Sequence, residues 1–462
     1  LIRLLTLLVI LNVRGSRLPR KLTDSCDNVH LTKSNATTEC DYNEHDHTLI
    51  CMDGIEEKWK SGDEKVRTLV LCHWPEEKLD PQSILRGFPA LRKFVISEGN
   101  LTKLISPFPS ELQSLEKLNI TGTKLKELPK QMISNLTNLK VVDLRNNDLT
   151  NVPLDSLDSP SLHHVHLSGN PLRCTEDTTW ILESRKGSVA RKITDKDKLL
   201  CAAPFEGRPL VPVVEIIKTL KMECTRTVCD CELVYVVGGA GKYIQKELMA
   251  FASVNCSYRD LTEMPSFLPA NTTTLYLTGN KIKDLSPLTT NPAYKGVIDL
   301  HLNENLIESV VQLEGSNWLE HFRLLNLRGN KLSDLPTYAL ENVLLHSGNA
   351  ARLFLGNNPW TCDCLFTPGF QDLLVKYANL VKDINDVRCS SSNGDDNSGK
   401  QIRDLTRTEI CMSTDEDPLL HPLDVLNIIL ASLIFLVLGK LLYDYWSFKK
   451  TGKLPWIVAK IP

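Results

Sequence analysis

The segment LKVVDLRNNDL, residues 139–149, begins 23 residues before a second segment of the same design, LHHVHLSGNPL, residues 162–172. Both follow the pattern L-x-x-L-x-L-x-x-N-x-L, with valine at the second apolar position. Looser copies begin at Leu115 and Leu91, each 24 residues further upstream, and a weaker copy begins at Val66. This part of the chain therefore holds about five copies of one unit, and recurrence at a fixed period is the signature of a repeat architecture.

A second series of copies begins at Thr272 and recurs after 25, 25 and 28 residues. Successive side chains of a strand point to opposite faces, so each Leu-x-Leu sends two side chains inward and leaves the middle residue outside. One unit cannot bury its leucines alone, but stacked units bury them together. The pattern resembles the leucine-rich-repeat family. It predicts an α/β solenoid with two blocks of repeats, at residues 66–172 and 272–358.

The ninth position of most copies is an asparagine. The six examples are Asn147, Asn170, Asn280, Asn305, Asn330 and Asn358. This position points inward, and a buried polar side chain needs hydrogen-bond partners, so we expect it to bond the backbone of adjacent units. Gly99 and Thr123 replace the asparagine in two copies of the first block, which predicts a less regular ladder there.

The chain has 14 cysteines, all between Cys26 and Cys411, and they cluster at the edges of the repeat blocks. An even number so placed indicates a disulfide framework made in an oxidising compartment, and buried free thiols are the alternative. Glycosylation sequons agree with this compartment. Six N-x-[ST] sites precede the hydrophobic C-terminal segment, at Asn35, Asn100, Asn119, Asn135, Asn255 and Asn271.

Two cysteine-bearing segments resemble flanking modules of the leucine-rich-repeat family. NPWTCDC at residues 358–364, with two later cysteines, resembles the C-terminal module, and the segment around Cys256 resembles the N-terminal one. The resemblance implies that Cys174 and Cys201 close a reduced C-terminal cap, which has Leu172 where tryptophan is usual. The implied disulfides are Cys174–Cys201, Cys224–Cys231, Cys229–Cys256, Cys362–Cys389 and Cys364–Cys411.

The four remaining cysteines, Cys26, Cys40, Cys51 and Cys72, are expected to cap the start of the first block. Four cysteines allow three pairings, and the sequence does not choose between them.

Both ends of the chain are hydrophobic. Residues 1–16 combine Arg3 with a short apolar run, which is typical of a signal peptide and too short to span a bilayer. Residues 423–442 form a run of 20, about 30 Å as a helix, and predict a transmembrane segment. A buried helix is the alternative for each. Lysines follow the second run, which places the tail in the cytoplasm and the cysteine-bearing part outside.

The predicted order of segments runs from the signal peptide to a short tail. It consists of a signal peptide (1–16), an N-terminal cysteine-rich cap (24–65), the first block (66–172), a C-terminal cap (173–223), a second N-terminal cap (224–271), the second block (272–358), its C-terminal cap (359–412), an acidic linker (413–422), a transmembrane helix (423–442) and a cytoplasmic tail (443–462).

This module order resembles the ectodomain of Toll-type receptors across roughly residues 24–412. The 20-residue tail departs from that family, which has a large cytoplasmic signalling domain, so direct signalling of the Toll kind is not expected. The arrangement and the tail are also similar to the insect halfway (singed wings) family. That resemblance implies a role in development and metamorphosis linked to the steroid ecdysone.

The middle residues of the strands predict a concave binding face. They are Val95, Asn119, Asp143, His166, Tyr276, His301, Asn326 and Phe354. Tyr276 and Phe354 are aromatic side chains of the kind that anchor protein interfaces, although simple exposure would also account for them. A glycan on Asn119 would obstruct the first block. We therefore expect Tyr276, His301, Asn326 and Phe354 in the second block to be the main binding face.

Little in the sequence indicates catalysis or a cofactor. His164 and His166 lie two apart on one predicted strand, which is metal-capable geometry, but a third ligand is not identifiable and a solvated face is the favoured interpretation. A pH-sensitive binding surface is the other alternative. No catalytic residue, cofactor or metal ligand is expected. A net charge of -3 does not favour nucleic acid.

The sequence thus predicts a single-pass type I protein of the plasma membrane, not an enzyme, whose extracellular solenoid binds a protein partner. Adhesion molecule, co-receptor and decoy are the roles considered, and the partner is an extracellular or cell-surface protein. One alternative is a shed ectodomain acting as a soluble ligand or modulator. An ectoenzyme using His164 or His166 is a further alternative, and homodimerisation is left open.

Overall fold

The computed structural model describes residues 26, 39–238, 248–346, 348–390, 397–411 and 422–452. Several sequence-based predictions lie outside these residues. They are the signal peptide, the sequon at Asn35, most of the acidic linker and the last part of the tail.

The first sheet has seven strands in the order β1-β2-β3-β5-β7-β8-β9. Their bounds are β1 Glu39–Asn43, β2 Thr48–Met52, β3 Thr68–Trp74, β5 Lys93–Gly99, β7 Lys117–Thr121, β8 Val141–Asp143 and β9 His164–His166. The β1–β2 pair is an antiparallel hairpin, and every later pair is parallel. A two-stranded sheet of β4 (Lys78–Leu79) and β6 (Lys103–Leu104) accompanies it.

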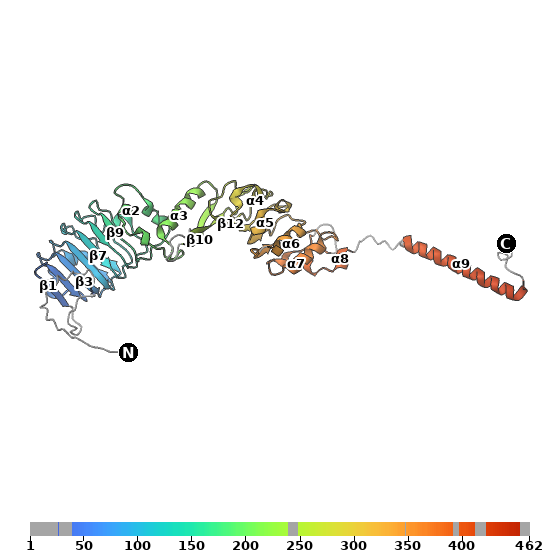
Figure 1. The fold of residues 1–462 in the computed structure, drawn as a ribbon, viewed down its shortest axis with the longest axis horizontal. Coiled ribbons are helices and arrows are strands. Elements are labelled where there is room, and N and C mark those ends of the chain that lie inside the picture. The colour runs from blue at the N-terminus through green and yellow to red at the C-terminus, as the bar shows by residue number, and fades with distance from the viewer. Residues whose placement is uncertain are drawn as a thin grey trace, which may run out of the picture.

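The second sheet has six strands in the order β10-β11-β12-β13-β14-β15. Their bounds are β10 Asp230–Val237, β11 Met249–Asn255, β12 Thr272–Tyr276, β13 Asp299–His301, β14 Leu324–Asn326 and β15 Arg352–Phe354. This sheet also opens on an antiparallel hairpin and continues in parallel. Figure 1 shows the strands following one another along an elongated body, with α3 between the two sheets.

Helices are short except at two places. The α-helices are α1 Pro81–Leu85, α2 Val189–Lys192, α3 Leu210–Cys224, α4 Pro287–Thr290, α5 Asn317–His321, α6 Thr337–His346, α7 Thr367–Lys376, α8 Arg407–Cys411 and α9 Pro422–Thr451. The 3-10 helices are η2 Glu57–Trp59, η3 Leu154–Ser156, η4 Glu176–Leu182, η5 Lys196–Lys198, η6 Pro292–Tyr294, η7 Val311–Leu313, η8 Ile384–Asp386 and η9 Ile402–Asp404.

The repeat leucines form the core, as the pattern predicts. Leu118 and Leu144 have no exposed surface and Leu327 is 1% exposed. Two hydrophobic clusters result, one for each sheet, but the boundary between them is not where the sheets change. Leu233 and Val236 of β10 belong to the first cluster together with buried residues of α3. The hairpin that opens the second sheet therefore packs on the end of the first core.

The asparagine ladder is present and its bonds follow the prediction. In each unit the side-chain amide donates to two backbone carbonyls, one of its own unit and one of the preceding unit. Asn305 Nδ2 donates to Leu302 O at 3.0 Å and to Leu277 O at 2.9 Å. Its Oδ1 accepts from the amide of Ile282 at 3.0 Å, so both polar groups of this side chain are paired. Asn147, Asn170, Asn280, Asn330 and Asn358 repeat this arrangement.

The ladder changes where the asparagine is missing, again as predicted. The Thr123 backbone amide donates to Asn147 Oδ1 at 3.1 Å, so at this position the ladder bond runs to the following unit. Gly99 has φ of +118°, and a β-carbon there would lie 2.4 Å from the backbone nitrogen of Trp74. Glycine is therefore required at this position, because the neighbouring strand approaches too closely for any side chain.

All fourteen cysteines are paired in seven disulfides. The five pairs implied by the family resemblance are present. Cys26 pairs with Cys72 and Cys40 with Cys51, which settles the choice that the sequence leaves open. The Cys40–Cys51 bridge joins the first hairpin across β1 and β2, so it closes the exposed start of the first core.

The C-terminal helix is longer than the sequence predicts. The hydropathy run ends at residue 442, but α9 continues to Thr451. It ends where Gly452 adopts φ of +66° and its amide donates to Phe448 O at 2.9 Å. The charged residues after the apolar run do not interrupt the helix, because cations such as Lys449 and Lys450 in the last turn complement the helix dipole. Among the described residues, α9 is the one helix long and apolar enough to cross a membrane.

Candidate binding surface

Four side chains form a row across the second sheet, one from each of four adjacent parallel strands. Tyr276, His301, Asn326 and Phe354 are paired in register and each is half-buried. Their neighbours Leu275, Leu300, Leu325 and Leu353 point into the core. Because adjacent strands lie about 4.8 Å apart, the row is a continuous strip, and its backbone is held by the sheet.

The two rings at one end of the row are stacked. The ring centroids of Tyr276 and His301 are 4.3 Å apart with planes at 18°. Burial lowers the pKa of His301, and the nearby carboxylate of Asp299 opposes this shift only in part. The neutral imidazole is therefore favoured, so this end offers an aromatic surface with one hydrogen-bond donor and one acceptor.

Charged side chains beside the row are neutralised within the protein. Arg323 Nε donates to Asp299 Oδ1 at 2.8 Å. Arg328 lies 2.6 Å from Asp386 and 3.4 Å from the buried Asp383. Asp383 also accepts from the backbone amides of Leu355 and Gly356, so the ion pair fixes the last unit to its cap.

Two other predicted face positions are not exposed. Val95 is 1% exposed and Asp143 is 6% exposed, so the prediction that they lie open on the concave face is wrong. Val95 lies in register between Val70 and Asn119. The carboxylate of Asp143 accepts from Arg145 Nε at 2.9 Å, and this ion pair shields it from water. Asn119 and His166 are half-buried.

The opening hairpin of the second sheet carries an apolar surface that the sequence reasoning missed. Tyr235 and Met249 are 51% and 58% exposed, and the Tyr235 and Phe251 ring centroids lie 6.5 Å apart. By strand alternation Phe251 shares a face with Asn255, which is in register with Tyr276. The run of apolar and β-branched residues from Leu233 to Val237 is a signal for such a strand.

Five sequons lie within the described residues, and one of them is beside the row. Asn100, Asn135, Asn255 and Asn271 are exposed and Asn119 is half-buried on β7. Asn255 lies directly beside Tyr276 in the sheet. A glycan on Asn255 would therefore flank the tyrosine end of the row and leave the phenylalanine end open.

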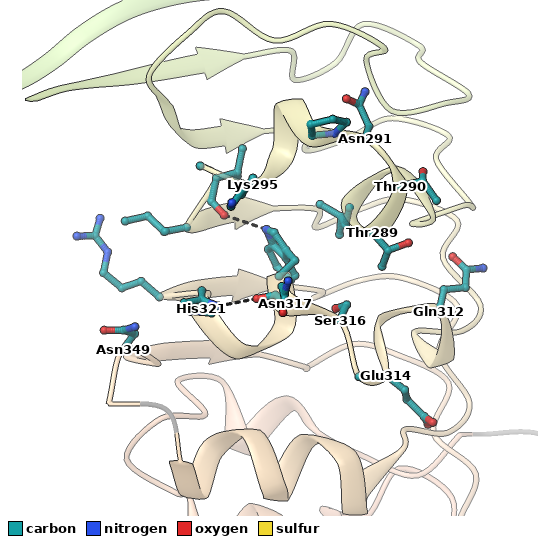
Figure 2. Close-up of a pocket in the computed structure, with 18 residues that line it drawn as sticks. Thr289, Thr290, Asn291, Lys295, Gln312, Glu314, Ser316, Asn317, His321 and Asn349 are labelled. Carbon is teal, nitrogen blue, oxygen red and sulfur yellow. Dashed lines mark hydrogen bonds between the residues drawn. The ribbon is translucent and has the colours of Figure 1, made fainter.

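A pocket of about 1090 Å³ lies beside the same repeats, where the chain enters β13 and β14. In Figure 2, Asn317 and His321 of α5 and Thr289 to Asn291 line one opening. Trp318 forms part of its wall and donates from Nε1 to Val297 O at 2.8 Å. Its lining combines neutral hydrogen-bonding side chains with apolar ones such as Leu288, Ile298 and Trp318.

The histidine cluster of the first sheet has local partners. His166 Nδ1 lies 2.9 Å from the Thr194 hydroxyl, and His163 Nδ1 lies 2.5 Å from Ser161 O. Across the described ranges, no group of three or more His, Cys, Asp or Glu side chains is arranged to hold a metal ion.

Stacked parallel strands, a ladder of buried asparagines, disulfide-closed ends and one apolar helix define a leucine-rich-repeat protein with a candidate membrane anchor. The leucine-rich-repeat family model matches residues 113–172, and the model for the halfway C-terminal domain matches residues 423–460. The chain belongs to the family that includes singed wings 2 of Drosophila melanogaster. It is 37% identical to that protein over 85% of this chain and 78% of singed wings 2.

Two further similarities are more distant. The halfway protein of Drosophila melanogaster is 28% identical over 81% of this chain, which spans only 60% of the length of halfway. A chain of the solved Drosophila Toll–Spatzle complex is 20% identical, with a TM-score of 0.36, over 76% of this chain and 46% of that chain.

Proposed function

We propose that this chain is a single-pass type I protein of the plasma membrane whose extracellular solenoid binds a protein partner. The binding face is the row Tyr276, His301, Asn326 and Phe354. The observation that carries the proposal is this half-buried row of two aromatic rings, an imidazole and an amide on one parallel sheet. Aromatic side chains of this kind are the common anchors of protein interfaces.

Rigidity supports this assignment. Each residue of the row sits between two core leucines, and the asparagine ladder fixes the turns that follow the strands. A surface that is already ordered loses little conformational entropy on binding. The charges beside the row are paired within the protein, so a partner need not supply a counter-charge at the centre.

The order of segments along the chain is part of the same proposal. Two blocks at 66–172 and 272–358 with four caps would form the extracellular part, and the region after α9 would be cytoplasmic. Nothing in this arrangement calls for catalysis, and we propose a non-enzymatic role as adhesion molecule, co-receptor or decoy. A role in insect development linked to ecdysone is proposed from the relation to singed wings 2 and halfway.

Changing Tyr276 and Phe354 together to alanine is expected to weaken partner binding by at least about a hundredfold, because interface anchors each contribute about 2 kcal/mol or more. The full chain would be displayed on cells and screened against a library of extracellular proteins, and the variant would be tested against each partner found. The matched control is Tyr258→Ala, since Tyr258 is exposed but lies outside the row. If both variants bound the partner equally well, the row would not be part of the interface.

Glycopeptide mass spectrometry of the full chain made in insect cells is expected to find glycans on Asn100, Asn119 and Asn255. Glycosylation at these sites requires that the repeats enter the secretory lumen, which tests the type I orientation. A glycan on Asn119 would also obstruct the first sheet, as proposed. If Asn119 is unmodified while Asn100 is modified, the reason for preferring the second block is lost. Unmodified sites throughout would contradict the orientation.

A further inference from the structure

Cationic side chains line one edge of the first sheet, where the chain enters its strands. Backbone bonds connect these entry positions directly: the amide of Arg92 donates to Arg67 O, that of Glu116 to Arg92 O, and that of Lys140 to Glu116 O. The residues that follow two of these entry positions are also cationic. They are Lys93 on β5 and Lys117 on β7, which are in register. The edge therefore presents neighbouring cations from four successive strands.

The same edge continues into the cap of the first sheet. Val165 of β9 pairs with Ile193, so the two residues before Ile193 lie beside His163 and His164. These residues are Arg191 and Lys192 at the end of α2. We name the complete set the basic strip. Its members are Arg67, Arg92, Lys93, Lys117, Lys140, Arg191 and Lys192.

The basic strip has seven cationic side chains, and the carboxylate of Glu116 lies among them at the entry position of β7. Lys140 Nζ lies 3.0 Å from Glu116, and this bond, with the charges of Lys140, Arg92 and Lys117, lowers the pKa of the carboxyl group. Glu116 thus remains charged and offsets one cation, while Arg67, Arg92, Lys117 and Arg191 lie exposed along the same edge. The whole chain has a net charge of -3, so the cations are segregated and not simply abundant.

The second sheet provides an internal comparison. Its entry positions are connected by the same backbone bonds, but they are Thr273, Ile298, Arg323 and Ala351. The one cation among them, Arg323, is bound to Asp299. The next residues along these strands are Thr274, Asp299, Leu324 and Arg352, which add one cation and one carboxylate. The repeat fold therefore does not require positive charge at this edge, and the basic strip is a specific property of the first sheet.

The shape of the basic strip indicates a linear partner. Five strand spacings separate β3, which follows Arg67, from the segment that holds Arg191. At about 4.8 Å each, the strip is about 24 Å long. Arg67, Arg92, Lys117, Lys140 and Arg191 are exposed along this length. A regular line of charges along an edge matches a linear polymer with regularly spaced anionic groups, and such attraction also accelerates association.

We infer that the basic strip binds a sulfated glycosaminoglycan lying across the strands of the first sheet. This site is separate from the row on the second sheet. The proposal takes its extracellular placement from the proposed function, but the binding itself does not depend on the row. A glycan on Asn119 would not cover the whole strip. On β7 the entry position lies three residues before Asn119, and the other members of the strip belong to four other segments.

The test uses the full chain in nanodiscs of phosphatidylcholine and a sensor coated with heparin. The strip variant is Arg92→Gln, Lys117→Gln and Arg191→Gln, three exposed positions. The matched control removes the same charge from Lys124, Lys126 and Lys130, which are exposed but follow the strands instead of preceding them. Thermal melting of each variant checks that folding is unchanged.

We expect the strip variant to bind heparin at least about tenfold more weakly than the wild type at 0.15 M NaCl, and the control to change less than about twofold. The dependence of log affinity on log salt should become shallower by about one unit per cation removed. Desulfated heparin should not bind. The wild type failing to bind heparin, or an equal loss in strip and control variants, would overturn the proposal.

A second arm presents phosphatidylserine vesicles to the same nanodiscs. Binding to these vesicles through the basic strip, with no binding to heparin, would assign the strip to an anionic membrane and reject the glycosaminoglycan. Partner binding through Tyr276 and Phe354 is measured independently on the same variants. Failure of either site is therefore distinguishable from failure of the other.

Discussion

Replacing Trp360 by alanine is expected to lower the free energy of opening the C-terminal cap by about 3–5 kcal/mol. Trp360 is completely buried, its ring centroid lies 4.7 Å from that of Phe370, and its Nε1 donates to Leu355 O at 3.1 Å. It covers the last repeat, so alanine would leave a cavity at the end of the second core, and Leu355 O would keep only the bond from Asn358 Nδ2. A solenoid depends on such end coverage, because its last unit has no neighbour.

Hydrogen exchange of the intact chain measures this local opening directly. Amides of β15 and α7 should exchange at least about a hundredfold faster in Trp360→Ala, since each 1.4 kcal/mol is a factor of ten. Leu365→Ala is the matched control. Leu365 belongs to the same cap but is 94% exposed, so a change below about 0.5 kcal/mol is expected. Unchanged exchange in the tryptophan variant would show that the cap does not depend on Trp360.

Asn305→Leu is expected to destabilise the second sheet by about 1–3 kcal/mol, although leucine has a similar size. The substitution removes the acceptor of the Ile282 amide. The carbonyls of Leu277 and Leu302 lose one donor each but still accept from Asn280 and Asn330. An unpaired buried backbone group costs about 1–3 kcal/mol, which outweighs the gain from a more apolar side chain. The midpoint of urea-induced protease cleavage within the second sheet should fall accordingly.

Asn326→Leu is the control for this experiment, because it makes the same chemical change one unit away. Asn326 lies on the open face, and its side chain bonds Asn303 and the amide of Arg328 at the surface. We expect a loss below about 1 kcal/mol. If both variants had the same midpoint, the inward position of the asparagine would not be what makes it important.

The repeat pattern was sufficient for everything that follows from local periodicity. Leu118, Leu144 and Leu327 could be assigned to the core because a period-2 strand within a unit of about 24 residues leaves them only one face. Asn305 could be assigned its role because a polar group at an inward position must be paired. The apolar run after residue 422 predicted a long helix because it is long enough to span a bilayer. The end of that helix was set by Gly452.

Charge and exposure across strands were harder to foresee. Val95 and Asp143 occupy the same repeat position as Tyr276, yet both are buried, because exposure depends on neighbouring strands and on partners such as Arg145. The apolar hairpin surface at Tyr235 and Phe251 has no signature in residue spacing, because strand pairing brings those rings together.

The sequence by itself determined the strand spacing, the inward leucines and asparagines, and the segments that close the ends. Only the tertiary structure decided which cysteines pair at the N-terminus, that β10 packs on the first core, and that cations from five distant segments share one edge. The physical reason is that periodicity fixes where a side chain points within one unit. What lies beside that side chain is fixed by the unit stacked against it, about 24 residues away in the chain.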